Sequence, residues 1–382
     1  MPENKDNKIL NVPNLRFPEF QGKWGKTTFG NIATGFDYGM NAAAKSYDGE
    51  NKYIRITDID ESSSTYDDKD IVSPDGTLSD KYLVKERDIL LARTGASTGK
   101  TYLYRKSDGK LYYAGFLIRA NVTTHNPYFV FSQLHTHRYW RWVSIMSARS
   151  GQPGINSQEY SSFPVFTTSM QEENKIAKLL SLLDDRISTQ NKIIDKLQSL
   201  IKGIRDGAFG KLRKSVGFNA MIGDVLSYEQ PQSYIVEDTE YTSEGTPVLT
   251  ANKAFILGYT SEIEGIYDKG DCIIFDDFTL DCKYVDFPFK VKSSAIKILT
   301  AKNKELLRYT FEFLKYLDLS TNEHKRHYIA ETQNQEFILP TVQIVKTIAH
   351  AFSALSLWQE TVVKQRYAFE KQKQYLLRQM FI

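Results

Sequence analysis

The sequence predicts an α+β protein: two mixed α/β domains, separated and followed by long helices that pair as an antiparallel coiled coil. The evidence is an apolar heptad pattern between Ile176 and Ile204, and a weaker copy of the first half of the chain in its second half. A chain of 382 residues has room for two or three domains. The predicted segments are domain one at 1–165, helix one at 166–210, domain two at 211–340 and helix two at 341–382.

A heptad pattern predicts the first long helix. Apolar residues occupy the a and d positions over four heptads, and Gln190 is the one polar exception. Such a seam is typical of a coiled coil. We expect the helix to run from about Gln171 to about Gly207. The predicted seam consists of Leu180, Leu183, Ile187, Gln190, Ile194, Leu197, Ile201 and Ile204.

An internal repeat predicts the second long helix, and such a repeat has to be recognised before a fold is assigned. A shift of 172 residues places Ile176 on Ile348 and Phe209 on Phe381. We expect antiparallel pairing, because parallel pairing would make the second domain span the full helix length again. The predicted seam of this helix consists of Ile348, Ala351, Leu355, Trp358, Val362, Gln365, Phe369, Gln372 and Leu376.

Each predicted seam has a glutamine near its middle. If Leu180 lies near Leu376, Gln190 lies close to Gln365, and we expect the two amides to meet in the core and form a hydrogen bond. A buried amide without a partner costs about 1–3 kcal/mol, whereas a polar pair in a seam can fix register. In the alternative arrangement the helices are offset by one turn and each amide reaches water.

Short segments rich in β-branched and aromatic residues predict the strands of domain one. A helix over Tyr128–Ser147 is predicted after the start signal Asn126-Pro127, and a loop broken by Gly and Pro follows at 150–154. In domain two, the helix expected at Leu306–Leu317 occupies the equivalent place. The predicted strands are Tyr53–Ile56, Asp88–Ala92, Thr101–Tyr104 and Gly115–Ile118, with Asp271–Ile274 as the counterpart of Asp88–Leu91.

Composition excludes several classes of protein. Hydrophobic residues make up 41% and charged residues 25% of the chain, as in an ordinary soluble domain. No apolar run reaches the ~18 residues that a membrane span needs, and the first residues lack the apolar core of a signal peptide. Two cysteines provide neither a disulfide framework nor a metal site. We therefore expect a cytoplasmic protein without a metal centre or membrane association.

Charge is segregated within each domain. Residues 101–165 contain 7 Lys and Arg against 2 Asp and Glu, and residues 283–327 contain 10 against 5. By contrast, 221–282 contains 2 against 13. A basic patch on one face is typical of a surface that binds phosphates, although charges also cluster by chance on solvated faces.

Two motifs resemble catalytic ones but depart from them. The segment 95–101 (GASTGKT) has three residues between its glycines, where a phosphate-binding P-loop needs four; a turn beside DNA is the favoured interpretation. Asn126-Pro127-Tyr128-Phe129 resembles the tetrapeptide of adenine methyltransferases. It lacks the second proline, and no glycine-rich cofactor loop precedes it, so an Asn-Pro helix start is favoured. We predict no catalytic residues in this chain.

Basic residues interleaved with aromatic ones are the better signal of DNA binding, because arginine reads guanine bidentately and binds phosphates. The alternative is that the aromatic residues belong to the core and the arginines only solvate the surface. The candidate DNA-binding residues are Arg93, Thr94, Lys100, Arg138, Arg141, Arg149, Gln152, Lys292, Lys325, Arg326 and Tyr328.

Two dissimilar domains, each followed by a repeated helix, resemble the specificity subunit of a type I DNA restriction–modification system. The motifs that carry the resemblance are Phe163-Pro164-Val165 followed by Gln171 to Ala177, Phe337 to Pro340 followed by Gln343, Trp24-Gly25 followed by Phe29-Gly30, and the strand at Asp88. The resemblance covers essentially the whole chain.

The resemblance implies that each domain binds one half of a bipartite site in double-stranded DNA and that the paired helices set the distance between the halves. It also implies partners: modification subunits that use S-adenosylmethionine to methylate adenine, and restriction subunits that hydrolyse ATP with Mg²⁺. No cofactor is then expected on this chain. Two alternatives are a coiled-coil adaptor that binds only proteins and a self-sufficient adenine DNA methyltransferase.

Overall fold

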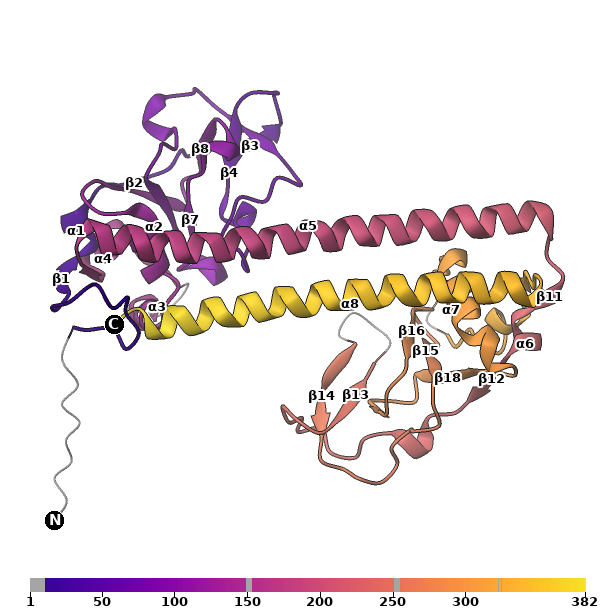
Figure 1. Ribbon diagram of the computed structural model, residues 1–382. Coiled ribbons are helices and arrows are strands. Elements are labelled where there is room, and N and C mark those ends of the chain that lie inside the picture. Colours follow the sequence, from indigo (N-terminus) through magenta and orange to yellow (C-terminus); the bar gives the residue numbers. More distant parts are fainter. Residues whose placement is uncertain (1–10, 149–152, 251–254, 322, 324) are drawn as a thin grey trace, which may run out of the picture. The chain divides into compact units, whose positions relative to one another are not determined.

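The computed structural model describes residues 11–148, 153–250, 255–321, 323 and 325–382. The chain divides into two units, and each contains parts of both long helices. The first unit comprises Met1–Gln190 and Gln365–Ile382, and the second comprises Asn191–Lys364. Figure 1 shows the elements of each unit.

A four-stranded antiparallel sheet forms the centre of the first unit. Its strand order is β2 (Ala33–Tyr38), β9 (Leu117–Val122), β6 (Asp88–Ala92) and β7 (Thr101–Leu103). Every residue of β6 is buried, because the sheet is covered on both faces, and this explains its unbroken apolar sequence. The strand predicted at 88–92 is confirmed, and the one at 101–104 ends one residue early.

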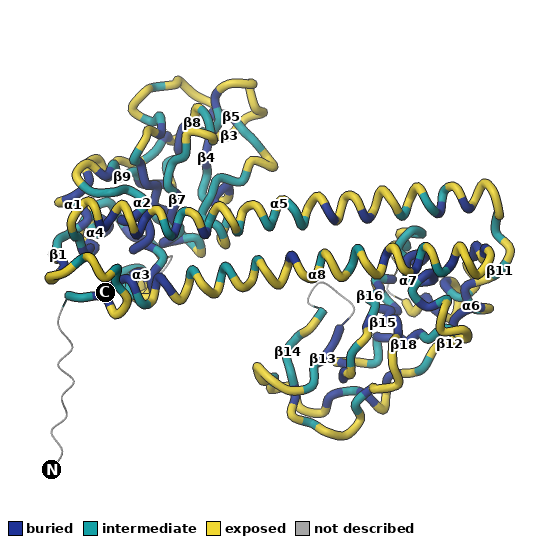
Figure 2. The backbone as a smooth tube through the Cα atoms, in the orientation of Figure 1, coloured by how far each residue is buried: buried dark blue, intermediate teal, exposed yellow. Residues whose placement is uncertain are grey.

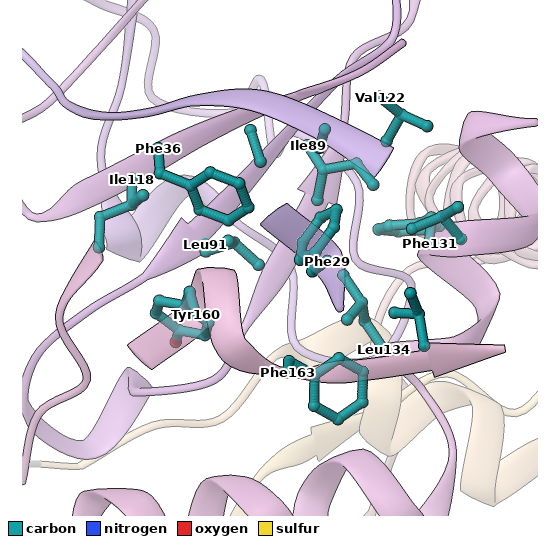
Figure 3. Packing of buried hydrophobic residues seen from close by; sticks show 14 of the residues in the cluster. Phe29, Phe36, Ile89, Leu91, Ile118, Val122, Phe131, Leu134, Tyr160 and Phe163 are labelled. Carbon is teal, nitrogen blue, oxygen red and sulfur yellow. The ribbon is translucent and has the colours of Figure 1, made fainter. Parts of the chain in front are cut away.

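Three helices cover one face of this sheet: α2 (Pro127–Gln133), α3 (His137–Ser147) and α4 (Ser157–Ser162). Figure 3 shows the core between these helices and the sheet, where Phe29, Ile89 and Ile118 meet Phe131 and Phe163. The core of the other face is formed by Leu90, Ala92 and Leu117 with neighbouring aromatic residues.

Smaller strand pairs complete the first unit. The helical turn α1 (Phe29–Ile32) links β1 to β2. The strand predicted at Gly115–Ile118 begins two residues later than expected, because Gly115 and Phe116 form a turn and β9 starts at Leu117. The pairs are antiparallel β1 (Gly25–Thr28) with β10 (Pro164–Thr167), antiparallel β3 (Ala43–Ser46) with β5 (Val72–Asp75), and parallel β4 (Lys52–Ile54) with β8 (Leu111–Tyr113).

The single helix predicted over Tyr128–Ser147 is wrong, because two helices occupy this stretch. Asn126 begins α2 as predicted, since its side chain accepts hydrogen bonds from the backbone N–H groups of Tyr128 and Phe129. The helix ends before Leu134, and Thr136 caps α3 by accepting from the N–H of Tyr139. Apolar residues continue at helical spacing across the interruption between α2 and α3. The sequence pattern therefore gave no sign that the helix is interrupted.

The second unit repeats the first. Its sheet has the equivalent strand order: β12 (Leu226–Glu229), β18 (Ile296–Ala301), β15 (Cys272–Asp276) and β16 (Cys282–Val285). The short antiparallel pair β11 (Ala220–Met221) and β19 (Glu336–Phe337) corresponds to β1 and β10. The predicted internal repeat is thus confirmed at the level of topology.

Further elements of the second unit occupy positions equivalent to those of the first. The parallel pair β13 (Thr246–Leu249) and β17 (Lys290–Val291) corresponds to β4 and β8, while β14 (Ile256–Thr260) extends it on the other side. The helical turn α6 (Ile222–Val225) corresponds to α1. Helix α7 (Leu307–Leu317) confirms the helix predicted at 306–317.

The two long helices are α5 (Met170–Ser215) and α8 (Val342–Gln379). Helix α5 continues eight residues past its predicted end, although Gly207 and Gly210 each cost about 1 kcal/mol in a helix. Burial of Phe209 and Leu212 in the core of the second unit offsets this cost. The helix ends before Gly217, whose φ of 76° is a conformation that favours glycine.

Both units contain α5 and α8 in antiparallel contact. In the first, Leu180 packs in one cluster with Leu376, and Lys373 Nζ lies 2.6 Å from Asp184 Oδ1. In the second, the guanidinium of Arg205 lies over the ring of Phe352 at 5.6 Å. Residues with higher numbers in α5 contact residues with lower numbers in α8. The predicted antiparallel pairing is therefore confirmed.

The predicted seam of α5 is correct from Leu180 to Ile201, where all positions are buried or half-buried (Figure 2). It fails at Ile204, which is 39% exposed, because the helix drifts and Arg205 takes the inward position. In α8 every second predicted position is one residue too early. The exposed positions Ala351, Trp358, Gln365 and Gln372 each precede one of the seam residues Phe352, Gln359, Arg366 and Lys373.

The amides of Gln190 and Gln365 meet, although not in a core. Gln190 Nε2 lies 3.5 Å from Gln365 Oε1, and Gln365 is exposed. The expected contact therefore forms at the edge of the seam, as a long hydrogen bond.

Candidate nucleic-acid interface

The segment that follows β6 is a fixed turn, not a phosphate loop. It joins β6 to β7, which are antiparallel, whereas a P-loop links a strand to a helix. Gly95 N–H donates to the carbonyl of Pro153 at 3.0 Å, and Thr94 forms a bridge with Gly154. Gly99 has a φ of 92°, and a Cβ there would lie 2.8 Å from Val143. The turn is therefore held between the sheet and α3.

Arg93, at the start of this turn, borders a cleft. Its guanidinium lies 4.7 Å from the ring centre of Tyr38, and its Nη1 lies 3.5 Å from the carbonyl of Gly115. The cleft has a volume of about 540 Å³, and Tyr38, Arg93 and Phe116 contribute to its lining. Tyr38 and Phe116 are 43% and 58% exposed. Aromatic faces beside an arginine suit contact with nucleic-acid bases.

The remaining basic candidates of the first unit lie in different environments. Lys100 Nζ is 3.6 Å from Glu61 Oε2, and only 21% of its side chain is exposed. Arg141 is exposed on α3 beside the exposed Trp140. These positions leave Arg93, Thr94 and Arg141 as the accessible candidates. Arg149 and Gln152 lie outside the described residues.

Arg138 no longer qualifies as a candidate, because its guanidinium points into the protein. It donates to the carbonyl of Pro164 at 2.7 Å and to Gln133 Oε1 at 3.1 Å, and it lies over the rings of Phe163 and Phe166. Burial lowers the pKa of Arg138 to about 10. Its role is to attach α3 to β10.

In the second unit, Tyr328 is also removed from the candidates, because it is 1% exposed and packs against Tyr228 and Phe275. Lys292 is exposed. Lys325 Nζ lies 2.9 Å from Glu331 Oε1, and this acidic neighbour weakens its attraction to phosphate. Arg326 is half-exposed, and its Nη1 donates to the carbonyl of Ser294 at 3.2 Å.

A buried polar group centred on Asp277 was missed by sequence reasoning. Asp277 Oδ1 accepts hydrogen bonds from the backbone N–H groups of His327 and Tyr328, and Oδ2 lies 3.6 Å from both Lys297 Nζ and Arg326 Nη1. Lys297 donates in turn to Gln230 Oε1 at 2.8 Å. Burial lowers the pKa of Lys297. The available signal was a lysine within the otherwise apolar segment Ile296–Leu299.

Buried carboxylates attach the first domain to α5. Glu172 is fully buried and lies 2.7 Å from the guanidinium of Arg16, while Trp24 Nε1 donates to it at 3.4 Å. Glu173 accepts from the backbone N–H of Asn126 at 2.9 Å and lies 2.8 Å from His125 Nδ1. These contacts explain why the motif at 171–177 directly follows the first domain in the sequence.

Two kinds of site are not found within the described residues. His, Cys, Asp and Glu side chains form no group of three or more that could hold a metal ion in the part of the chain that the structure describes. Among the same residues, no helix is long and apolar enough to cross a membrane.

Comparison with known proteins finds similarity to one class of protein. The type I restriction modification DNA specificity domain matches residues 32–199. A specificity subunit of an Escherichia coli type I restriction enzyme is 45% identical over 126 residues, which is 31% of this chain and 31% of that protein. The chain thus matches about a third of the length of this relative.

The fold is shared with a solved structure over nearly its full length. The S subunit of a type I restriction-modification system from M. genitalium superposes with a TM-score of 0.68 at 14% identity, covering 97% of this chain and 99% of that one. The predicted resemblance of the chain to the specificity subunit of a type I restriction–modification system is thereby confirmed.

Proposed function

We propose that this chain is the DNA-recognition subunit of a type I restriction–modification complex and that each of its two domains binds one half of a bipartite site in double-stranded DNA. The observation that carries this proposal is the repeat itself. Two domains share the strand order of their central sheets yet differ in their exposed polar residues. A protein that reads two different half-sites on one scaffold requires this combination.

The binding is proposed to have two components. Exposed lysines and arginines supply attraction to phosphates, which is independent of sequence and weakens with salt. Side chains that reach base edges in the groove supply specificity. Arg93 and Arg141 in the first unit and Lys292 and Arg326 in the second are candidates for either component.

The chain is proposed to be non-catalytic. In this proposal, modification subunits supply S-adenosylmethionine and transfer the methyl group, and restriction subunits supply ATP and Mg²⁺. The role of this chain is to place those subunits on a chosen DNA sequence.

Selection from a random DNA pool tests the proposal. The chain, assembled with its modification subunits, is expected to enrich DNA with two short motifs separated by a gap of constant length. An adaptor that binds only proteins would enrich no sequence. Binding of S-adenosylmethionine by the isolated chain, measured by calorimetry, would instead favour the self-sufficient methyltransferase.

A further inference from the structure

One position is equivalent in the two domains by backbone contacts. Arg93 directly follows β6, and Asp277 directly follows the corresponding strand β15. The carbonyl of Arg93 accepts from Ile155 N–H at 2.9 Å, and the carbonyl of Asp277 accepts from His327 N–H at 3.0 Å. Ile155 and His327 are themselves related by the shift of 172 residues. Arg93 and Asp277 therefore occupy equivalent positions in the fold that the two domains share.

Strand register identifies the neighbours of this position. In the first domain Tyr38 lies opposite Ile118, which lies opposite Leu91 of β6. In the second domain Lys297 lies opposite Phe275 of β15 and takes the place of Ile118. Since Glu229 pairs with Ile298, the next residue, Gln230, comes opposite Lys297 and takes the place of Tyr38.

The chemistry at this shared place differs between the domains. The first domain has a planar guanidinium over an exposed tyrosine ring, and the buried Ile118 lies opposite that tyrosine in the sheet. The second has an exposed amide, Gln230, whose oxygen is occupied by the buried Lys297. Within the described part of the chain the amide nitrogen of Gln230 remains as a donor. Arg326 is held by the same buried pair, with its Nη1 3.6 Å from Asp277 Oδ2.

The fold of the second domain does not require its buried charges on Lys297 and Asp277. The first domain forms the same sheet with Ile118 in place of Lys297. Burying an ion pair usually gives less stability than apolar residues of similar volume would. The pair of Lys297 and Asp277 is therefore explained better by what it holds at the surface, namely Gln230 and Arg326.

We infer that the two domains read DNA bases from this equivalent place, through Arg93 supported by Tyr38 in the first domain and through Gln230 and Arg326 in the second. The inference rests on the proposed function. A guanidinium fork held over a ring suits the two acceptors of guanine. An amide donor held in place suits an acceptor on a base edge. Lys297 and Asp277 act as positioning residues.

The test is a double dissociation in the assembled complex with modification subunits, by selection from a random DNA pool. Arg93→Lys keeps the charge but loses the fork. It is expected to reduce preference at one position of one half-site by about tenfold or more, with the other half-site unchanged. Gln230→Ala is expected to do the same in the other half-site only.

Matched controls separate base reading from general effects. Lys106→Ala removes an exposed charge of the first unit, and Gln335→Ala removes an exposed glutamine of the second; both are expected to leave the selected motif unchanged. A cooperative thermal unfolding transition of Arg93→Lys and of Gln230→Ala would confirm that both variants fold.

Several outcomes would overturn the inference. They are an unchanged motif in both variants, a change of both half-sites by one variant, or an equal loss of affinity for all sequences, which indicates phosphate contact. A wild-type complex that selects no bipartite motif would refute the proposed function itself, and the two failures are thereby distinguished.

Discussion

At the scale of single residues, buried ionic groups carry much of the organisation of this chain. Glu172 and Asp277 are each nearly inaccessible to solvent, and each contacts an arginine and further donors. A buried charge that loses its partner costs several kcal/mol. Stability at these two points should therefore respond to mutation and to pH.

Glu172→Gln should destabilise the first unit by about 3 kcal/mol, because it removes the charge that compensates Arg16. Burial raises the pKa of Glu172, but hydrogen bonds from Arg16 and Thr168 outweigh it, and the pKa is lowered overall. The unfolded carboxyl titrates near 4.3. The stabilisation is therefore complete above that pH and is lost as pH falls through the lower folded pKa. Urea unfolding between pH 7 and pH 3 should show a shallower acid loss in the variant; equal slopes would contradict this assignment.

Lys297→Ile should destabilise the second unit, because it leaves Asp277 with only the half-exposed Arg326 as counter-charge. Adding Asp277→Asn should recover part of the loss, since the asparagine oxygen can still accept from His327 and Tyr328. A double-mutant cycle by urea unfolding should give a coupling of about 1–3 kcal/mol. Additive effects would mean that the two charges do not interact.

At the scale of elements, the long helices show how far a repeat pattern predicts packing. The seam of α5 was predicted correctly over most of its length, because apolar residues occupy nearly every inward position. The seam of α8 was not predicted correctly. Gln359, Arg366 and Lys373 take inward positions, while Trp358 points outward and is 53% exposed. Polar side chains in a seam follow from pairing with the other helix, as Lys373 does with Asp184, and no pattern within one helix reveals this.

The corrected seam predicts opposite outcomes for two neighbouring aromatic residues of α8. Phe352→Ala should cost about 3–5 kcal/mol, because Phe352 is 1% exposed. Trp358→Gln should change stability by no more than about 0.5 kcal/mol, since Trp358 lies on the exposed side. Chemical unfolding of both variants measures the difference. A larger loss for Trp358→Gln would restore the seam predicted from sequence.

At the scale of the whole molecule, the fold was largely predictable and the candidate site was not. The repeat, the two long helices and the central strand at Asp88 follow from periodicity and turn signals. Sequence reasoning proposed Arg138 and Tyr328 as DNA contacts because they stand beside other basic and aromatic residues, yet both are held within the protein. It missed Gln230, because an exposed glutamine becomes notable only when Lys297, 67 positions later, is seen to hold it.

The last prediction concerns the distance between half-sites and rests on the proposed function. The boundary between the two units crosses α5 after Gln190 and α8 before Gln365. Inserting one heptad at each of these points preserves the a and d phase on both sides. It adds roughly 10 Å of helix at 1.5 Å per residue, which corresponds to about three base pairs of DNA at 3.4 Å each.

Selection from the random pool should therefore return the same two half-site motifs with a gap about three base pairs longer. A heptad inserted in α5 alone serves as the control, because it breaks the pairing without lengthening both helices. It should reduce binding rather than lengthen the gap. New half-site motifs with an unchanged gap would show that the helices do not set the spacing, even if both domains read DNA as proposed.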